Sequence, residues 1–153
     1  MKPKPIEESQ INILPHILYE IEMFLNLPSV RGTNLGEYAI LESRLIHARN
    51  LKTFFEAGRQ KYPDDVIPSD FGFDAKSVDI PKNISKRFNK DLSHISYSRL
   101  KQTPETQKWT YADFINPIKS RCIEFARFII NNYKDKMSKG ELSRWENLLE
   151  SKT

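Results

Sequence analysis

The sequence has little cysteine, little glycine and no long apolar run. Cys122 is its only cysteine, so an intramolecular disulfide and a cysteine-based metal site are both excluded. No apolar stretch approaches the roughly 18 residues that a membrane span needs. The first ten residues, MKPKPIEESQ, lack the apolar core of a secretory signal. These absences predict a cytoplasmic protein without membrane contact.

Nucleotide-binding motifs are also missing. The chain has only five glycines, and they form neither a Gly-rich phosphate loop nor a dinucleotide fingerprint. No cofactor is therefore predicted. The aspartates at positions 64, 65, 70 and 74 raise the alternative of a cation site. They lack the spacing of an EF-hand loop and its central glycine, so we predict no metal.

Charge is distributed unevenly along the chain. Residues 1–81 hold nine Lys or Arg and twelve Asp or Glu, a net charge of −3. Residues 82–153 hold fifteen Lys or Arg and eight Asp or Glu, a net charge of +7. A basic half is compatible with a polyanion partner such as RNA. It is equally compatible with the solvated surface of ordinary helices.

Helical periodicity dominates the sequence. Asn34 and Glu37, and again Ser138 and Glu141, have the spacing of capping boxes and predict two helix starts. We expect residues 1–11 to form a flexible arm and residues 12–153 to form one α-helical domain. The fold class is then all-α, a single-domain bundle of about four to five helices. The predicted helices cover residues 12–28, 34–57, 81–100 and 110–136, with a last one from residue 138.

One long connection interrupts this helical pattern. Residues 58–81 contain three prolines and two glycines, which argues against a helix there. Val66, Ile67, Phe71 and Phe73 give the segment an apolar side. We therefore expect a loop that docks on the bundle. Long loops of this kind are often functional.

The segment ISKRFNKDLSHISYSRLK, residues 84–101, holds the main candidate site. At about 100° per residue, Arg87, Asp91 and His94 share one polar strip along the edge of an apolar stripe. Arg87 and His94 are two turns apart, roughly 10 Å along the axis. Asp91 lies within one turn of both and could orient either side chain.

These residue types suit RNA strand cleavage. Histidine can accept or donate a proton near neutral pH. Arginine can hold a phosphate by two hydrogen bonds and offset the charge on its oxygens. Attack by a neighbouring 2′-hydroxyl would need no metal. The competing interpretation is a salt-bridged edge on a structural helix, which has the same Arg–Asp–His pattern.

The sequence Arg87-Phe88-Asn89-Lys90-Asp91-Leu92-Ser93-His94 resembles the Arg-x6-His motif of the HEPN helical-bundle family. The family usually has a polar residue directly after the arginine. In this sequence that position is Phe88, and the polar Asn89 follows one position later. Segments ESRLIHARNLKTFF and NKDLSHISY also look like uncharacterised bacterial HEPN-like proteins. The resemblance implies a metal-independent endoribonuclease of a toxin or phage-defence type, with its site at a homodimer cleft. In that role Arg87 would bind the scissile phosphate and His94 would move the proton.

Further residues are candidates for RNA contacts. Lys86 and Lys90 lie beside the Arg–His strip, and Tyr97 and Arg99 follow it. Aromatic and basic side chains together can stack bases and hold phosphates. Lys101 and Trp109 follow in the same basic and aromatic stretch, although Trp109 could equally pack the start of the next helix.

Arg44 and His47, on the second predicted helix, have two interpretations. They could join Arg87 and His94 in one polar pocket. The alternative for His47 is a buried, hydrogen-bonded core position.

Two functions of other classes remain open. One is a non-catalytic interaction module, such as an antitoxin-like or adaptor subunit in a defence complex, with the Arg–Asp–His edge as its interface. The other is a nucleotide-binding bundle without cleavage, which a bound nucleotide would stabilise against heat.

Overall fold

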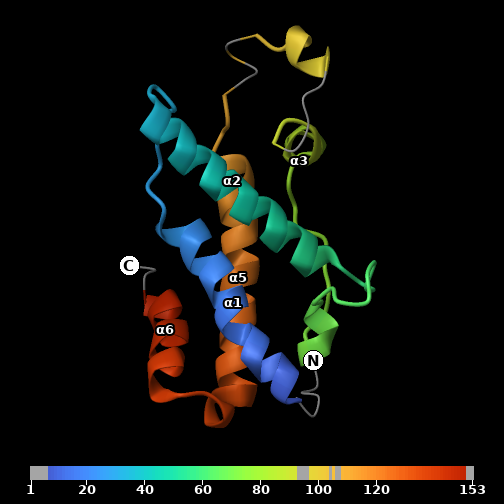
Figure 1. The fold of residues 1–153 in the computed structure, drawn as a ribbon, viewed down its shortest axis with the longest axis vertical. Coiled ribbons are helices and arrows are strands. Elements are labelled where there is room, and N and C mark those ends of the chain that lie inside the picture. Colours follow the sequence, from blue (N-terminus) through green and yellow to red (C-terminus); the bar gives the residue numbers. More distant parts are fainter. Residues whose placement is uncertain (1–6, 93–96, 104, 106–107, 151–153) are drawn as a thin grey trace.

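The computed structural model describes residues 7–92, 97–103, 105 and 108–150. Within these ranges the chain forms five α-helices, three short 3-10 helices and no strand, so the predicted all-α bundle is confirmed (Figure 1). Among the described residues, none of the helices has both the length and the apolar character needed to cross a bilayer. The elements are α1 (Glu8–Asn26), α2 (Leu35–Glu56), η1 (Pro68–Phe71), α3 (Lys82–Lys90), η2 (Tyr97–Lys101), α5 (Ala112–Tyr133), η3 (Lys134–Lys136) and α6 (Lys139–Glu150).

Helix α1 begins four residues before the predicted start. The side chain of Gln10 accepts a hydrogen bond from the Glu7 amide at 2.7 Å and donates one to the carbonyl of Asp70 at 2.9 Å. These bonds satisfy an amide that the helix start leaves unpaired, and they tie the first turn to η1. Residues 8–11 of the predicted arm therefore belong to α1. Residues 1–6 lie outside the described residues.

Helix α2 is the central element of the bundle. It packs against α1, α3 and α5, while α6 packs against α5 and α1. Figure 1 shows α2 crossing α5 obliquely, with α6 alongside the far half of α5. Phe125 of α5 marks the middle of the core, because its ring contacts rings from α2, from the connection after α2 and from α6. Those rings are Phe54, Phe55, Phe71, Phe73 and Trp145.

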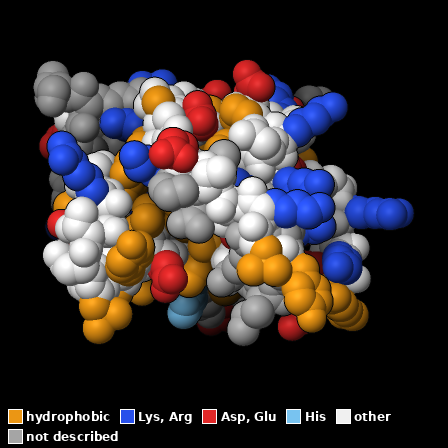
Figure 2. All heavy atoms as spheres, turned by 90° about the horizontal axis from the view of Figure 1, so that it is seen from above, with side chains coloured by type: hydrophobic (Ala, Val, Ile, Leu, Met, Phe, Trp, Pro, Cys, Tyr) orange, Lys and Arg blue, Asp and Glu red, His pale blue; other side chains and the backbone are white. Residues whose placement is uncertain are grey.

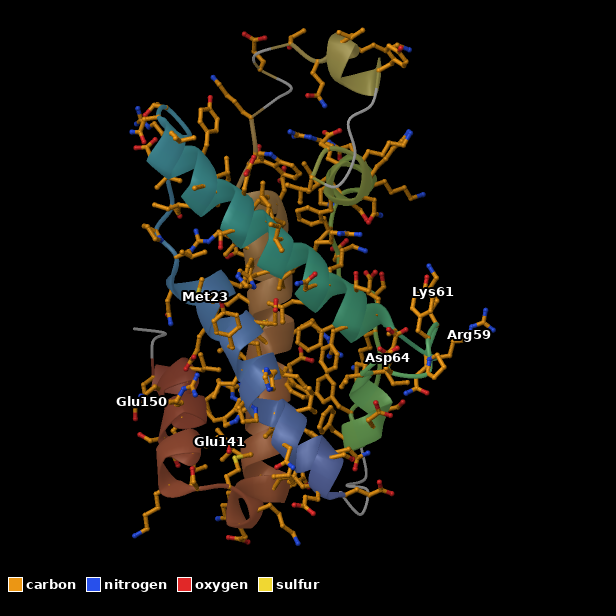
Figure 3. The ribbon with its side chains drawn as sticks, in the orientation of Figure 1. Met23, Arg59, Lys61, Asp64, Glu141 and Glu150 are labelled. Carbon is orange, nitrogen blue, oxygen red and sulfur yellow. The ribbon has the colours of Figure 1, made fainter. Side chains whose placement is uncertain are left out.

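The connection after α2 docks on the bundle, as predicted. Ile67, Phe71 and Phe73 are buried, and the Tyr133 hydroxyl donates to the Phe71 carbonyl at 2.6 Å. The tip of the connection projects away from the bundle (Figure 3). Two carboxylates of the connection accept hydrogen bonds from backbone amides. Asp65 accepts from the amides of residues 61 and 62, and Asp70 accepts from the Ile67 amide. In the part of the chain that the structure covers, no three acidic, His or Cys side chains are grouped to hold a metal.

The third predicted helix is shorter than expected, and this prediction was wrong. α3 ends at Lys90, and η2 is a separate 3-10 helix rather than its continuation. The physical reason is burial. Ile84 and Phe88 anchor α3 in the core, whereas Tyr97 and Leu100 are 89% and 81% exposed. A helix segment without a buried face lacks the packing that stabilises most helices in proteins.

Candidate functional site

An open groove beside α3 is the main candidate site. It has a volume of about 530 Å³ and brings together three parts of the chain. α3 forms one wall, the last residue of η2 and residues that follow it form the rim, and the start of α5 closes the end. We call it the α3 groove. Its lining includes Asn83, Ile84, Lys86, Arg87, Lys90, Asp91, Lys101, Gln102, Glu105, Lys108, Thr110 and Asp113.

Five cationic side chains line the α3 groove, against three carboxylates. Lys86, Lys90, Lys101 and Lys108 are exposed. None of these four lysines forms an ion pair with a carboxylate in the described part of the chain. Figure 2, which views the end of the molecule that bears α3, shows Lys and Arg side chains gathered on one side. Lysines held close together without neutralising partners attract anions.

Arg87 is fixed by several contacts at the inner wall. Its Nε donates to the Asp91 carboxylate at 3.1 Å, and its Nη1 donates to the Lys108 carbonyl at 2.9 Å. The guanidinium lies 4.0 Å above the ring of Trp109. Trp109 also stacks with Phe88, at 5.4 Å between ring centroids. Arg87 therefore joins α3 to the segment before α5, and it is only 17% exposed.

Asp91 links the two walls of the groove. Besides Arg87, its carboxylate accepts a hydrogen bond from the Gln102 side chain at 2.8 Å. Asp91 is 14% exposed, so its charge acts in partly desolvated surroundings. Glu105 lies at the rim of the groove. Hydrogen bonds from the Glu105 backbone amide and the Thr103 hydroxyl lower the pKa of the Glu105 carboxyl, which is ionised at neutral pH. Asp91 thus holds Arg87 at the groove wall, whereas its predicted contact with His94 lies outside the described residues.

The RNA-contact candidates are distributed around this groove. Lys86 and Lys90 line it directly, and Tyr97 lies on η2, which leads to Lys101 at the rim. Arg99 lies in η2, and its side chain is outside the described residues. His94 is also outside the described residues. α3 itself ends at Lys90, and Asp91 caps it with its amide bonded to the Arg87 carbonyl.

The side chains of Arg44 and His47 form hydrogen bonds within the helical bundle. The Arg44 guanidinium donates to the Phe24 carbonyl at 3.2 Å, to the Leu27 carbonyl and to the Ser29 hydroxyl at 3.0 Å, so it caps the end of α1. Burial lowers the pKa of Arg44. His47 is 8% exposed, and its Nδ1 lies 2.8 Å from the Glu20 carboxylate.

These contacts run to α1 and the connection after it. His47 is thus a buried, hydrogen-bonded core histidine, the second of the two interpretations. None of the contacts seen for Arg44 and His47 in the described chain involves Arg87.

Sequence reasoning missed Gln102 and Lys108 as groove residues. Lys108 could have been noticed beside Trp109, because a cation next to an aromatic ring is a common nucleic-acid pattern. Gln102 carried no such signal, because its role depends on the fold bringing it to Asp91. The assembled groove can hold phosphate groups through its lysines.

Compared with protein-family models, with curated proteins and with solved structures, the chain matches nothing.

Proposed function

We propose that this protein binds RNA through the α3 groove. The observation that carries the proposal is the set of Lys86, Lys90, Lys101 and Lys108, which line one groove without ion pairs to described carboxylates. Phosphodiester oxygens are the natural partners for such a set, because each contact releases condensed counterions. Tyr97, 89% exposed on the neighbouring η2, offers a ring on which a base can stack.

We further propose that the bound RNA is cleaved without a metal, as the HEPN resemblance implies. Arg87 would hold the scissile phosphate and His94 would act as the acid or base. A 2′-oxygen attacks phosphorus, the bond to the 5′-oxygen breaks, and the proton passes from the attacking to the leaving oxygen. The products are a 2′,3′-cyclic phosphate and a 5′-hydroxyl. A toxin or phage-defence ribonuclease acting as a homodimer is the setting that this resemblance suggests.

The second candidate function is a non-catalytic interaction module. The contacts of Arg87 favour it, because Asp91, the Lys108 carbonyl and the Trp109 ring already engage the guanidinium. A phosphate would have to compete with these groups for the same donors. In this alternative the Arg87–Asp91 pair holds the groove together, and an RNA or a protein partner binds without reaction.

The binding test uses labelled single-stranded RNA in EDTA, titrated at several salt concentrations. Lys90→Gln/Lys108→Gln should weaken binding and reduce the slope of log K against log salt by about 1.4, since each phosphate contact on a single strand contributes about 0.7. Lys134→Gln/Lys136→Gln is the matched control, because these lysines lie in η3, at the opposite end of α5 from α3 (Figure 1). Equal binding by both double variants would exclude the α3 groove.

The cleavage test compares wild type with His94→Ala on the same RNA. Cyclic-phosphate ends from wild type alone would assign cleavage to His94. RNA binding without cleavage by either protein would leave the non-catalytic module. Cleavage retained in His94→Ala would remove the proposed mechanism.

A further inference from the structure

A second basic groove lies on the other side of α3, between α3, α2 and the segment before α3. It consists of two adjoining hollows of about 290 and 660 Å³, which share Lys52, Glu56, Ser85 and Asn89. We call it the α2–α3 groove. Nothing in the sequence pattern pointed to it, because its residues come from distant parts of the chain. Its polar lining is Arg49, Lys52, Thr53, Glu56, Ser77, Asp79, Lys82, Ser85, Lys86 and Asn89.

The charges of the α2–α3 groove favour an anionic ligand. Lys52 and Glu56 form an ion pair. The other carboxylate oxygen of Glu56 accepts a hydrogen bond from the Val78 amide at 2.9 Å, so Glu56 joins α2 to the segment before α3. Arg49, Lys82 and Lys86 form no ion pair with a carboxylate among the described residues. Asp79 is the one remaining carboxylate in the lining.

Hydrogen-bond donors accompany these cations. Ser77 and Ser85 contribute hydroxyls, and Asn89 contributes an amide. Such neutral donors commonly contact phosphate and sugar oxygens beside Lys and Arg. The α2–α3 groove therefore combines both kinds of group that hold a nucleic-acid backbone.

Lys86 joins the two grooves, since it lines both. On the helical wheel Lys86 lies opposite the buried face formed by Ile84 and Phe88, which puts it on the outer ridge of α3. Lys90 falls on the side of the α3 groove, and Asn89 falls on the side of the α2–α3 groove. α3 is thus a basic ridge with a hollow on each flank.

We infer that one RNA strand crosses α3 and occupies both grooves, with Lys86 beneath the crossing point. This inference rests on the proposed RNA binding and specifies its ligand as a single strand rather than a mononucleotide or a helix end. A helix with its side chains is about 10 Å wide, so a single phosphate cannot occupy both hollows. The strand must supply several successive phosphates.

The test combines stoichiometry with salt dependence. Wild type should bind one strand of about 12 nucleotides but two strands of about four nucleotides, within the range of single-strand site sizes in other proteins. Arg49→Gln/Lys82→Gln should reduce the salt slope for the long strand by about 1.4. Adding Lys90→Gln/Lys108→Gln should reduce it by about 2.8, because one strand makes both sets of contacts. Lys134→Gln/Lys136→Gln again serves as the control.

Each failure has its own signature. If Arg49→Gln/Lys82→Gln binds the long strand like wild type while Lys90→Gln/Lys108→Gln does not, the crossing is wrong and the proposed function stands. If wild type binds no RNA, both are wrong. If polyglutamate binds in place of RNA with the same dependence on these variants, the grooves serve an acidic protein and the inference is overturned.

Discussion

At the scale of single residues, two arginines of this chain have different roles. Arg44 is buried, and its guanidinium donates hydrogen bonds at the end of α1, where helix carbonyls lack intrahelical partners. Arg87 is less buried and binds a carboxylate, a carbonyl and an aromatic face at the wall of a groove. The planar fork of arginine suits both tasks, and a lysine would fit neither.

Replacing Arg44 tests its structural role. Arg44→Met should lower the free energy of unfolding by about 2–4 kcal/mol, because carbonyls at the end of α1 lose a charged donor while they stay partly buried. Urea unfolding followed by circular dichroism measures the change. Arg127→Met, an exposed position on α5, should stay within about 0.5 kcal/mol of wild type. A stable Arg44→Met protein with reduced RNA affinity would instead place Arg44 in the site.

At the scale of elements, the helix boundaries follow from caps and burial. Asn34 begins α2, and its side chain accepts the Glu37 amide at 3.0 Å. Ser138 accepts the Glu141 amide at 3.2 Å ahead of α6. α3 shows the role of burial, because Ile84 and Phe88 anchor it in the core, whereas Tyr97 and Leu100 beyond its end are exposed.

Removing the cap of α2 gives a measurable cost. Asn34→Ala should destabilise the protein by about 1 kcal/mol, the usual contribution of an N-cap side chain. The midpoint of urea unfolding should fall with an unchanged m-value. Asn34→Asp, which keeps an acceptor oxygen, should retain most of the stability. Equal losses in both variants would show that the cap hydrogen bond is not the cause.

At the scale of the whole molecule, a core of aromatic rings joins helices that are far apart in sequence. α5 crosses this core, and the docked connection contributes Phe71 and Phe73 to it. Cys122 of α5 is fully buried within the same core. Burial raises the pKa of its thiol, so the folded protein holds it as the unreactive neutral form.

Cys122 therefore reports on opening of the whole bundle. At pH 8, a thiol reagent should label the native protein slower than the unfolded protein by a factor on the order of 10³ or more. Increasing urea should speed labelling in parallel with loss of helical signal, because access requires opening of the core. Labelling on mixing, with the helical signal intact, would show that α5 is reached by local motion.

The sequence by itself determined the all-α class, the caps at Asn34 and Ser138 and the docking of the long connection. Periodicity, cap chemistry and apolar content are local properties, and they act wherever the segment ends up. The sequence also indicated Lys86, Lys90 and Arg87 as residues of one basic surface, since they are neighbours on one short helix.

Only the tertiary structure decided where α3 ends and what surrounds it. α3 ends at Lys90, and the sequence pattern of residues 91–100 does not reveal that Tyr97 and Leu100 are exposed. The two grooves depend on residues as far apart as Arg49 and Lys108, which packing of α2, α3 and the start of α5 brings to the same ridge. A charge pattern along a chain cannot determine such a surface, because long-range packing selects which charges become neighbours.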